Sequence, residues 1–272
     1  MSPVLPALRG DLHLSFSETG ALTAIPVLGL GAAAVPGAVL VNRFGARRVV
    51  ALSLLALGLA GILRIVPPLP YSLFFWTAVL ALAVAVAQPG INVLIRDWFP
   101  GHVQQASNIY AMALGLGGLS GASVSVYLLV LGGWRGVFVF WPALTLAAAL
   151  LWAARAPGRG HPHAAEPAGL RRLAREWEVW HVALLFGTQS LVYYGGATWI
   201  PFLLRGRGPG YLALVLFLYQ VFSPPLSLAL SLVRAPWATS RLWYATGGIL
   251  VTLGAAALML GLLDLAWLAA AL

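Results

Sequence analysis

The chain has 272 residues, of which 61% are hydrophobic and 8% are charged, and its formal net charge is +9. It contains no cysteine, which excludes disulfides, CxxC redox sites and thiolate metal sites. The 16 basic residues are all arginines in short gaps between apolar blocks, so they form no continuous basic face and argue against binding to nucleic acid.

Apolar blocks of about twenty residues follow one another along the chain, and this length is typical of helices that cross a bilayer. They predict eight such helices, at residues 21–41, 47–67, 72–95, 104–131, 136–154, 180–204, 211–233 and 242–262. The longest polar gap is rich in Pro, Gly and charge, which indicates a linker. We therefore expect an all-α integral membrane protein with an N-terminal bundle at 1–154, a linker at 155–179 and a C-terminal bundle at 180–272.

The arginines are divided unequally between the two sides of the predicted helices. Eleven lie in gaps on the side of residues 42–48, and five lie on the other side. The positive-inside rule therefore places residues 42–48 in the cytoplasm of a multi-pass protein of the cell (inner) membrane. The cluster in this loop, which is at least a topological anchor, consists of Asn42, Arg43, Gly45, Arg47 and Arg48.

The stretch "NRFGARR" resembles G-x-L-x-D-R-x-G-R-R, the signature between the second and third helices of the major facilitator superfamily. The matching positions are Leu40, Arg43, Gly45 and Arg47. The positions that depart from the signature are Ala38, Asn42 and Ala46, and Asn42 replaces its acidic residue. The resemblance implies a charge latch for one gating state, in which the glycine permits a tight turn and arginines face helix C-termini. Gating and orientation alone both stay open for this loop.

Longer stretches, such as "INVLIRDWFPGHVQQASNIYAMALGLGG" and "FGTQSLVYYGGATWIPFLLRG", resemble the cyanate-permease branch of this superfamily. The resemblance implies a two-bundle transporter of twelve helices that moves a small solute, for example a small anion, by alternating access. It also implies that about eight helices, two to nine, are complete and that the chain is truncated at both ends. The alternative is a truncated or degenerate chain that embeds in the membrane without transporting.

Uncharged polar side chains are the candidate substrate contacts, because no charged residue lies deep inside a predicted helix. Gln88 and Asn92 are four residues apart and share a helix face, with a Pro-Gly pair between them. Gln189 and Tyr193 also share a face, and Tyr194 lies beside them. Transporters of this kind bind near the bilayer midplane, so these five residues are the candidate substrate-binding site. The alternative is that they form interhelical hydrogen bonds and packing contacts.

A glycine-rich stretch in the fourth predicted helix has two interpretations. Gly117 and Gly121 form a G-x-x-x-G step, which predicts close helix packing. The same stretch contains G-L-S-G, and an intramembrane serine protease would need His181 to activate Ser120. The two residues are expected at different depths, roughly 24 Å apart at 1.5 Å per residue, so we expect no enzyme.

His161 and His163 lie in the predicted linker, with Glu166 as the one acidic residue nearby. Three such residues in a flexible segment make a poor metal cage, so we expect neither a metal nor another cofactor. The expected partners are the lipid bilayer and a small-molecule substrate.

Overall fold

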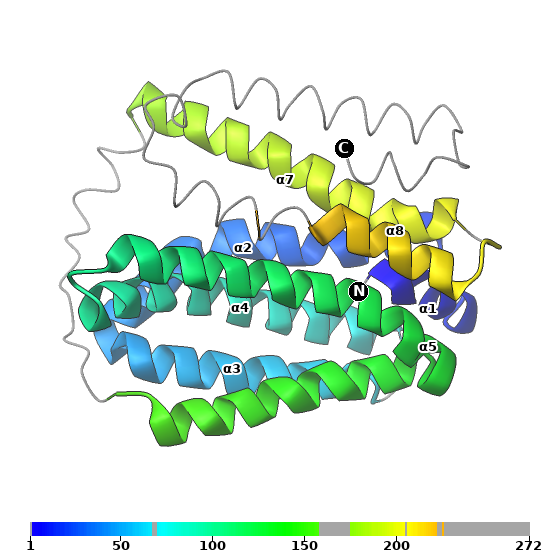
Figure 1. The fold of residues 1–272 in the computed structure, drawn as a ribbon, viewed down its shortest axis with the longest axis horizontal. Helices are drawn as coiled ribbons and strands as arrows, with labels where there is room; N and C mark the ends of the chain where they lie inside the picture. Colours follow the sequence, from blue (N-terminus) through cyan, green and yellow to red (C-terminus); the bar gives the residue numbers. More distant parts are fainter. Residues whose placement is uncertain (1, 67–69, 158–174, 205, 222–224, 226–272) are drawn as a thin grey trace. The chain divides into compact units, whose positions relative to one another are not determined.

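The computed structural model describes residues 2–66, 70–157, 175–204, 206–221 and 225, whose helices are labelled in Figure 1. The elements in chain order are a short 3-10 helix (Ser2–Val4), α1 (Leu5–Asp11), α2 (Phe16–Phe44), α3 (Ala46–Leu63), α4 (Pro70–Trp98), α5 (Val103–Arg155), α7 (Trp177–Leu203) and α8 (Pro209–Val221). The prediction of an all-α protein is confirmed. The predicted helix at 242–262 lies outside the described residues, as does most of the predicted linker.

The long helix α5 consists of two helices joined at a kink. Gly133 has φ 62° and ψ −171°, outside the helical region, and a positive φ is readily adopted by glycine. The kink lies between the predicted helices 104–131 and 136–154. Within the described residues, four helices contain segments long and apolar enough to cross a membrane, and α5, with 53 residues, is one of them. The kink therefore gives this part of the chain five membrane-length segments.

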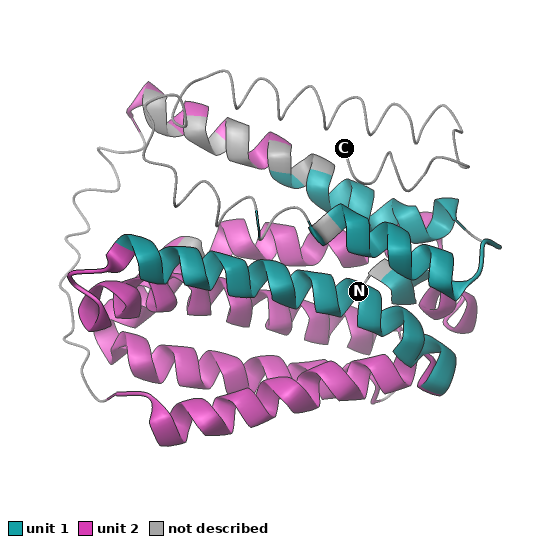
Figure 2. Ribbon diagram, in the orientation of Figure 1, with its two compact units in different colours: residues 1–6, 104–131, 190–272 teal, residues 7–103, 132–189 magenta. Residues whose placement is uncertain are grey.

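The chain divides into two compact units, which are coloured separately in Figure 2. Unit 1 comprises residues 1–6, 104–131 and 190–272, and unit 2 comprises residues 7–103 and 132–189. The first half of α5 therefore belongs to unit 1 and its second half to unit 2. The division into bundles on either side of residues 155–179 stays a prediction, since residues 158–174 are not described.

Small residues allow α2 and α4 of unit 2 to pack at short distance. Gly29, Ala33 and Gly37 recur at every fourth position of α2 and share one face. A Cβ atom added to Gly29 would lie 2.7 Å from the Cβ of Ala81, and one added to Gly37 would lie 3.0 Å from the Cα of Val86. Such small-residue faces are how helices associate in membranes, where lipid is as apolar as the side chains.

Gly117 and Gly121 of α5 have no close helix partner within the part of the chain that the structure describes. A Cβ atom added to either glycine meets no other atom of the described residues within 4 Å. Close packing at this G-x-x-x-G step stays a prediction, since the predicted helix at 242–262 lies outside the described residues. Among the described helices, close contacts form at Gly29 and Gly37, where α4 lies alongside α2.

A polar and aromatic cluster lies at the end of unit 2 that is opposite to residues 42–48. Trp134 is buried, and its Nε1 donates a hydrogen bond of 2.7 Å to Oδ2 of Asp11. The ring of Phe138 meets that of Trp134 edge-on at 5.7 Å, and the buried guanidinium of Arg64 lies 4.3 Å from the centre of the Phe138 ring. These contacts connect α1, the end of α3 and the second half of α5.

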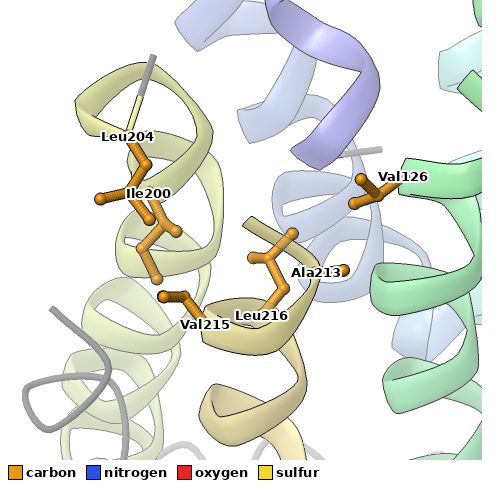
Figure 3. Packing of buried hydrophobic residues seen from close by; sticks show 6 residues of the cluster. All are labelled: Val126, Ile200, Leu204, Ala213, Val215 and Leu216. Atoms are coloured by element: carbon orange, nitrogen blue, oxygen red, sulfur yellow. The ribbon is translucent and has the colours of Figure 1, made fainter. Parts of the chain in front are cut away.

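The core of unit 1 is formed by three segments, shown close by in Figure 3. Its buried residues are Val126 of α5, Ile200 of α7, Leu204 directly after α7, and Ala213, Val215 and Leu216 of α8. The chain reverses between α7 and α8, where Gly206 and Gly208 have φ of 91° and 83°. Positive φ suits glycine, so the sequence "RGRGPG" explains the tight connection.

Candidate functional site

Gln88 and Asn92 lie one turn apart on α4, and both side chains are exposed. Gly90 lies on the opposite face of the helix, since two residues correspond to about 200° of rotation. There a Cβ atom added to Gly90 would lie 2.9 Å from Cγ2 of Val50 on α3. The helix α4 therefore packs against α3 with one face and presents the polar pair on the other.

The candidate residues of α7 fall in both units. Gln189 belongs to unit 2, whereas Tyr193 and Tyr194 belong to unit 1. The structure therefore brings together two pairs, Gln88 with Asn92 on α4 and Tyr193 with Tyr194 on α7. A single site formed by all five residues stays a prediction.

A third tyrosine joins the pair on α7. The rings of Tyr193 and Tyr194 meet edge to face, with centroids 5.2 Å apart and planes at 82°. Tyr219 of α8 stacks on Tyr193 at 5.7 Å and 21°, and its hydroxyl donates a hydrogen bond of 2.9 Å to the main-chain oxygen of Tyr193. Sequence reasoning missed Tyr219 because no motif or helical spacing connects α7 with α8.

The loop between α2 and α3 is reduced to a single residue, Gly45. Its φ is 83° and its ψ 139°, and its N–H donates a hydrogen bond of 2.9 Å to the carbonyl oxygen of Val41. This is the tight turn that the family signature implies. Arg43 and Arg48 are exposed, Asn42 is half-buried, and the Arg43 guanidinium lies 5.4 Å from the ring centre of Phe44.

Arg47 reaches from this turn to the end of α5. Its Nη2 donates a hydrogen bond of 3.3 Å to the carbonyl oxygen of Ala153, and Nε1 of Trp152 donates one of 3.2 Å to the carbonyl oxygen of Arg47. The last carbonyl groups of a helix carry a negative partial charge, which favours a cation. Trp152 also contacts Trp98 of α4, with ring centroids 5.6 Å apart. Arg47 thus connects α3 to α5, and Trp152 connects α5 to α4.

Replacing Gly45 with Ala is expected to lower the free energy of unfolding by about 1 kcal/mol, because an L side chain is disfavoured at this positive φ. Thermal unfolding in detergent micelles measures the change. The control is Gly20→Ala within α2, where an added Cβ meets no atom within 4 Å among the residues that the structure describes, and alanine is the better helix former. Equal melting temperatures for the two variants would contradict this account of the turn.

The residues considered for catalysis have other partners in the structure. Oγ of Ser120 donates to carbonyl oxygens of its own helix, at 2.9 Å from Leu116 and 3.1 Å from Gly117. The ring of His181 meets that of Trp177 edge-on at 4.9 Å. Among the described residues, no three or more His, Cys, Asp or Glu side chains gather as they would around a metal ion. His161 and His163 lie outside the described part of the chain.

Comparison with known proteins adds a family and several relatives. The profile of the Major Facilitator Superfamily matches residues 1–272. The chain is 29% identical to the uncharacterized transporter YycB of Bacillus subtilis over 213 residues, 76% of this chain and 52% of that protein. It is 30% identical to the 2-nitroimidazole transporter of Escherichia coli over 210 residues, 76% and 53% of the two chains. It is 25% identical to the cyanate transport protein CynX of Escherichia coli over 205 residues, 74% and 53%. The chain thus spans about half the length of these relatives.

Proposed function

The chain belongs to the Major Facilitator Superfamily, and on that premise we propose that the protein carries a small solute across a membrane by alternating access. The family match along all 272 residues is the observation that carries this proposal. The surface of the helices supports it, because large apolar side chains point outward. Leu28 and Leu150 are 69% exposed and Leu52 is 65% exposed, which suits contact with lipid tails rather than water.

We propose the inner membrane as the location, with residues 42–48 on the cytoplasmic side. The support is the excess of arginines on that side of the predicted helices. In this orientation Gly45 and Arg47 lie at the cytoplasmic end of unit 2. There the loop serves as an anchor and, by its likeness to the family signature, as part of the gate.

We propose that the substrate of the protein is small and either neutral or anionic. Two of the relatives carry the names of their substrates, 2-nitroimidazole and cyanate, and both substrates are small solutes. No Asp, Glu, Lys or Arg lies between residues 71 and 95 or between 177 and 204 except Glu178, near the start of α7. The proposed contacts on these helices are therefore uncharged: Gln88, Asn92, Gln189, Tyr193 and Tyr194.

Replacing Gln88 or Asn92 with Leu is expected to lower solute uptake about 10-fold, which corresponds to about 1.4 kcal/mol of lost interaction. Leu keeps a similar volume but removes the polar atoms. The assay is uptake of radiolabelled 2-nitroimidazole and cyanate by membrane vesicles, divided by the amount of protein in the membrane.

The chain offers a matched control with the same residue types and spacing. Gln104 and Asn108 lie in the first turns of α5, where Nε2 of Gln104 donates a hydrogen bond of 3.3 Å to Oδ1 of Asn108. Leu at these two positions should leave uptake within about twofold of the wild type, since a twofold change is under 0.5 kcal/mol. If the Gln88 and Gln104 variants lose uptake equally, the assigned site is wrong. If the wild type shows no uptake at all, the alternative of a membrane-embedded chain without transport is correct.

A further inference from the structure

Two neighbouring glycines of α7 have different surroundings. A Cβ atom added to Gly196 would lie 2.5 Å from Oη and 3.1 Å from Cζ of Tyr219, whereas one added to Gly195 meets no atom of the described residues within 4 Å. Real Cβ contacts are essentially never so short as the first of these distances. Gly196 is therefore the residue that leaves room for Tyr219 against α7.

Both the hydroxyl and the ring of Tyr219 contact α7 beside Gly196. The hydroxyl donates to the main-chain oxygen of Tyr193, and the ring stacks on the ring of Tyr193. Because the acceptor belongs to the backbone of α7, side-chain rotation of Tyr193 cannot move it. Tyr219 thus limits the positions open to the Tyr193 ring.

The result is a corner of two perpendicular tyrosine rings supported by a third ring. Tyr193 and Tyr194 stay 37% and 41% exposed, so part of each ring is accessible. Residues 187–204 of the chain contain no charged side chain. Such a surface distinguishes solutes by shape and by their π electrons, not by an ion pair.

We infer that this corner is the part of the substrate site that selects planar heteroaromatic solutes, with Tyr219 and Gly196 as positioning residues. The inference rests on the proposed transport function and narrows its substrate class. A flat ring can stack on one tyrosine while its edge meets the other, as aromatic pairs in proteins prefer. A stacking contact of this kind is worth about two- to tenfold in affinity. Linear cyanate has no ring to place on the corner.

The experiment compares Gly196→Ala with Gly195→Ala in membrane vesicles, with 2-nitroimidazole and cyanate as probes. Both substitutions add one methyl group to adjacent positions of α7, but only the first displaces Tyr219. We expect Gly196→Ala to raise the KM for 2-nitroimidazole about 10-fold and Gly195→Ala to leave it within about twofold. The ratio of cyanate uptake between the two variants should stay near one.

Tyr219→Phe is the second variant, which avoids a steric change in α7. It keeps the stacked ring and removes the hydrogen bond, so the expected rise in KM is smaller, about threefold. This variant also decides the question if Gly196→Ala does not reach the membrane.

The outcomes separate this inference from the proposed function. Equal KM values for 2-nitroimidazole in the two alanine variants, together with an unchanged KM in Tyr219→Phe, would show that the Tyr193 and Tyr194 rings do not select the solute. The proposed transport function would still stand. Equal losses for both probes in Gly196→Ala, or a wild type that takes up cyanate only, would overturn the selection of planar solutes. A wild type that takes up neither probe would overturn transport itself, and the inference with it.

Discussion

Replacing Gly61 with Leu is expected to lower the free energy of unfolding by about 3 kcal/mol, the upper part of the range for overpacked cores. Gly61 is buried on α3, and an added Cβ would already overlap Cγ and Cβ of Pro142 in the second half of α5. The proline ring is rigid, so it cannot turn aside as a flexible side chain could. The strain must therefore separate α3 from α5.

Unfolding of the purified protein in detergent measures this loss. The control is Gly31→Leu on α2, where the glycine is exposed and an added Cβ meets nothing within 4 Å in the described part of the chain. Adding Pro142→Ala to Gly61→Leu should restore part of the stability, because residues in contact do not have additive effects. A Gly61→Leu protein as stable as the Gly31→Leu protein would show that α3 and α5 do not pack as described.

Replacing Asp11 with Ala is expected to lower the free energy of unfolding by about 2 kcal/mol, since it leaves a buried indole N–H without its acceptor. The hydrogen bond from Nε1 of Trp134 to the carboxylate is short, at 2.7 Å, and Trp134 is only 3% exposed. Bonds to a charged acceptor are stronger than neutral ones. Asp11→Asn keeps an oxygen acceptor and should cost less.

A double-mutant cycle with Trp134→Phe isolates the contribution of this bond. Phe retains an aromatic ring but has no N–H, so Asp11→Ala should cost markedly less in the Trp134→Phe protein than in the wild type. The same cost in both backgrounds would mean that Asp11 stabilises unit 2 by another route. Detergent unfolding of the four proteins provides the comparison.

The positions of the helices could be predicted from the sequence because the bilayer sets their length. Blocks of about twenty apolar residues correspond to α2, α3, α4, α7 and the two halves of α5. The gap between the predicted helices 104–131 and 136–154 also predicted the interruption of α5, where Gly133 has its positive φ. These features depend on residues that are neighbours in the sequence.

The contacts between helices could not be predicted in the same way. Trp134 and Asp11 are 123 residues apart, and Arg47 and Ala153 are 106 apart. A local pattern shows that a small or polar face exists but not which helix will cover it. For this reason the spacing of Gly117 and Gly121 does not identify a partner helix, and the contact of Gly29 with Ala81 was not predicted.

In the candidate site, too, contacts between helices could not be predicted from the local sequence. Polarity within apolar blocks was enough to select Gln88, Asn92 and the tyrosines of α7. The role of Gly196 becomes visible only when α8 is placed beside α7, because its neighbour Gly195 looks identical in the sequence. Tyr219 was missed for this reason.

Uptake by proteoliposomes that contain only the purified protein shows whether this chain transports a solute. Radiolabelled 2-nitroimidazole and cyanate are the solutes, and protein-free liposomes give the background. We expect uptake of at least one solute that saturates with concentration and is inhibited by the unlabelled compound. Uptake equal to that of protein-free liposomes for both solutes would contradict the proposed transport function.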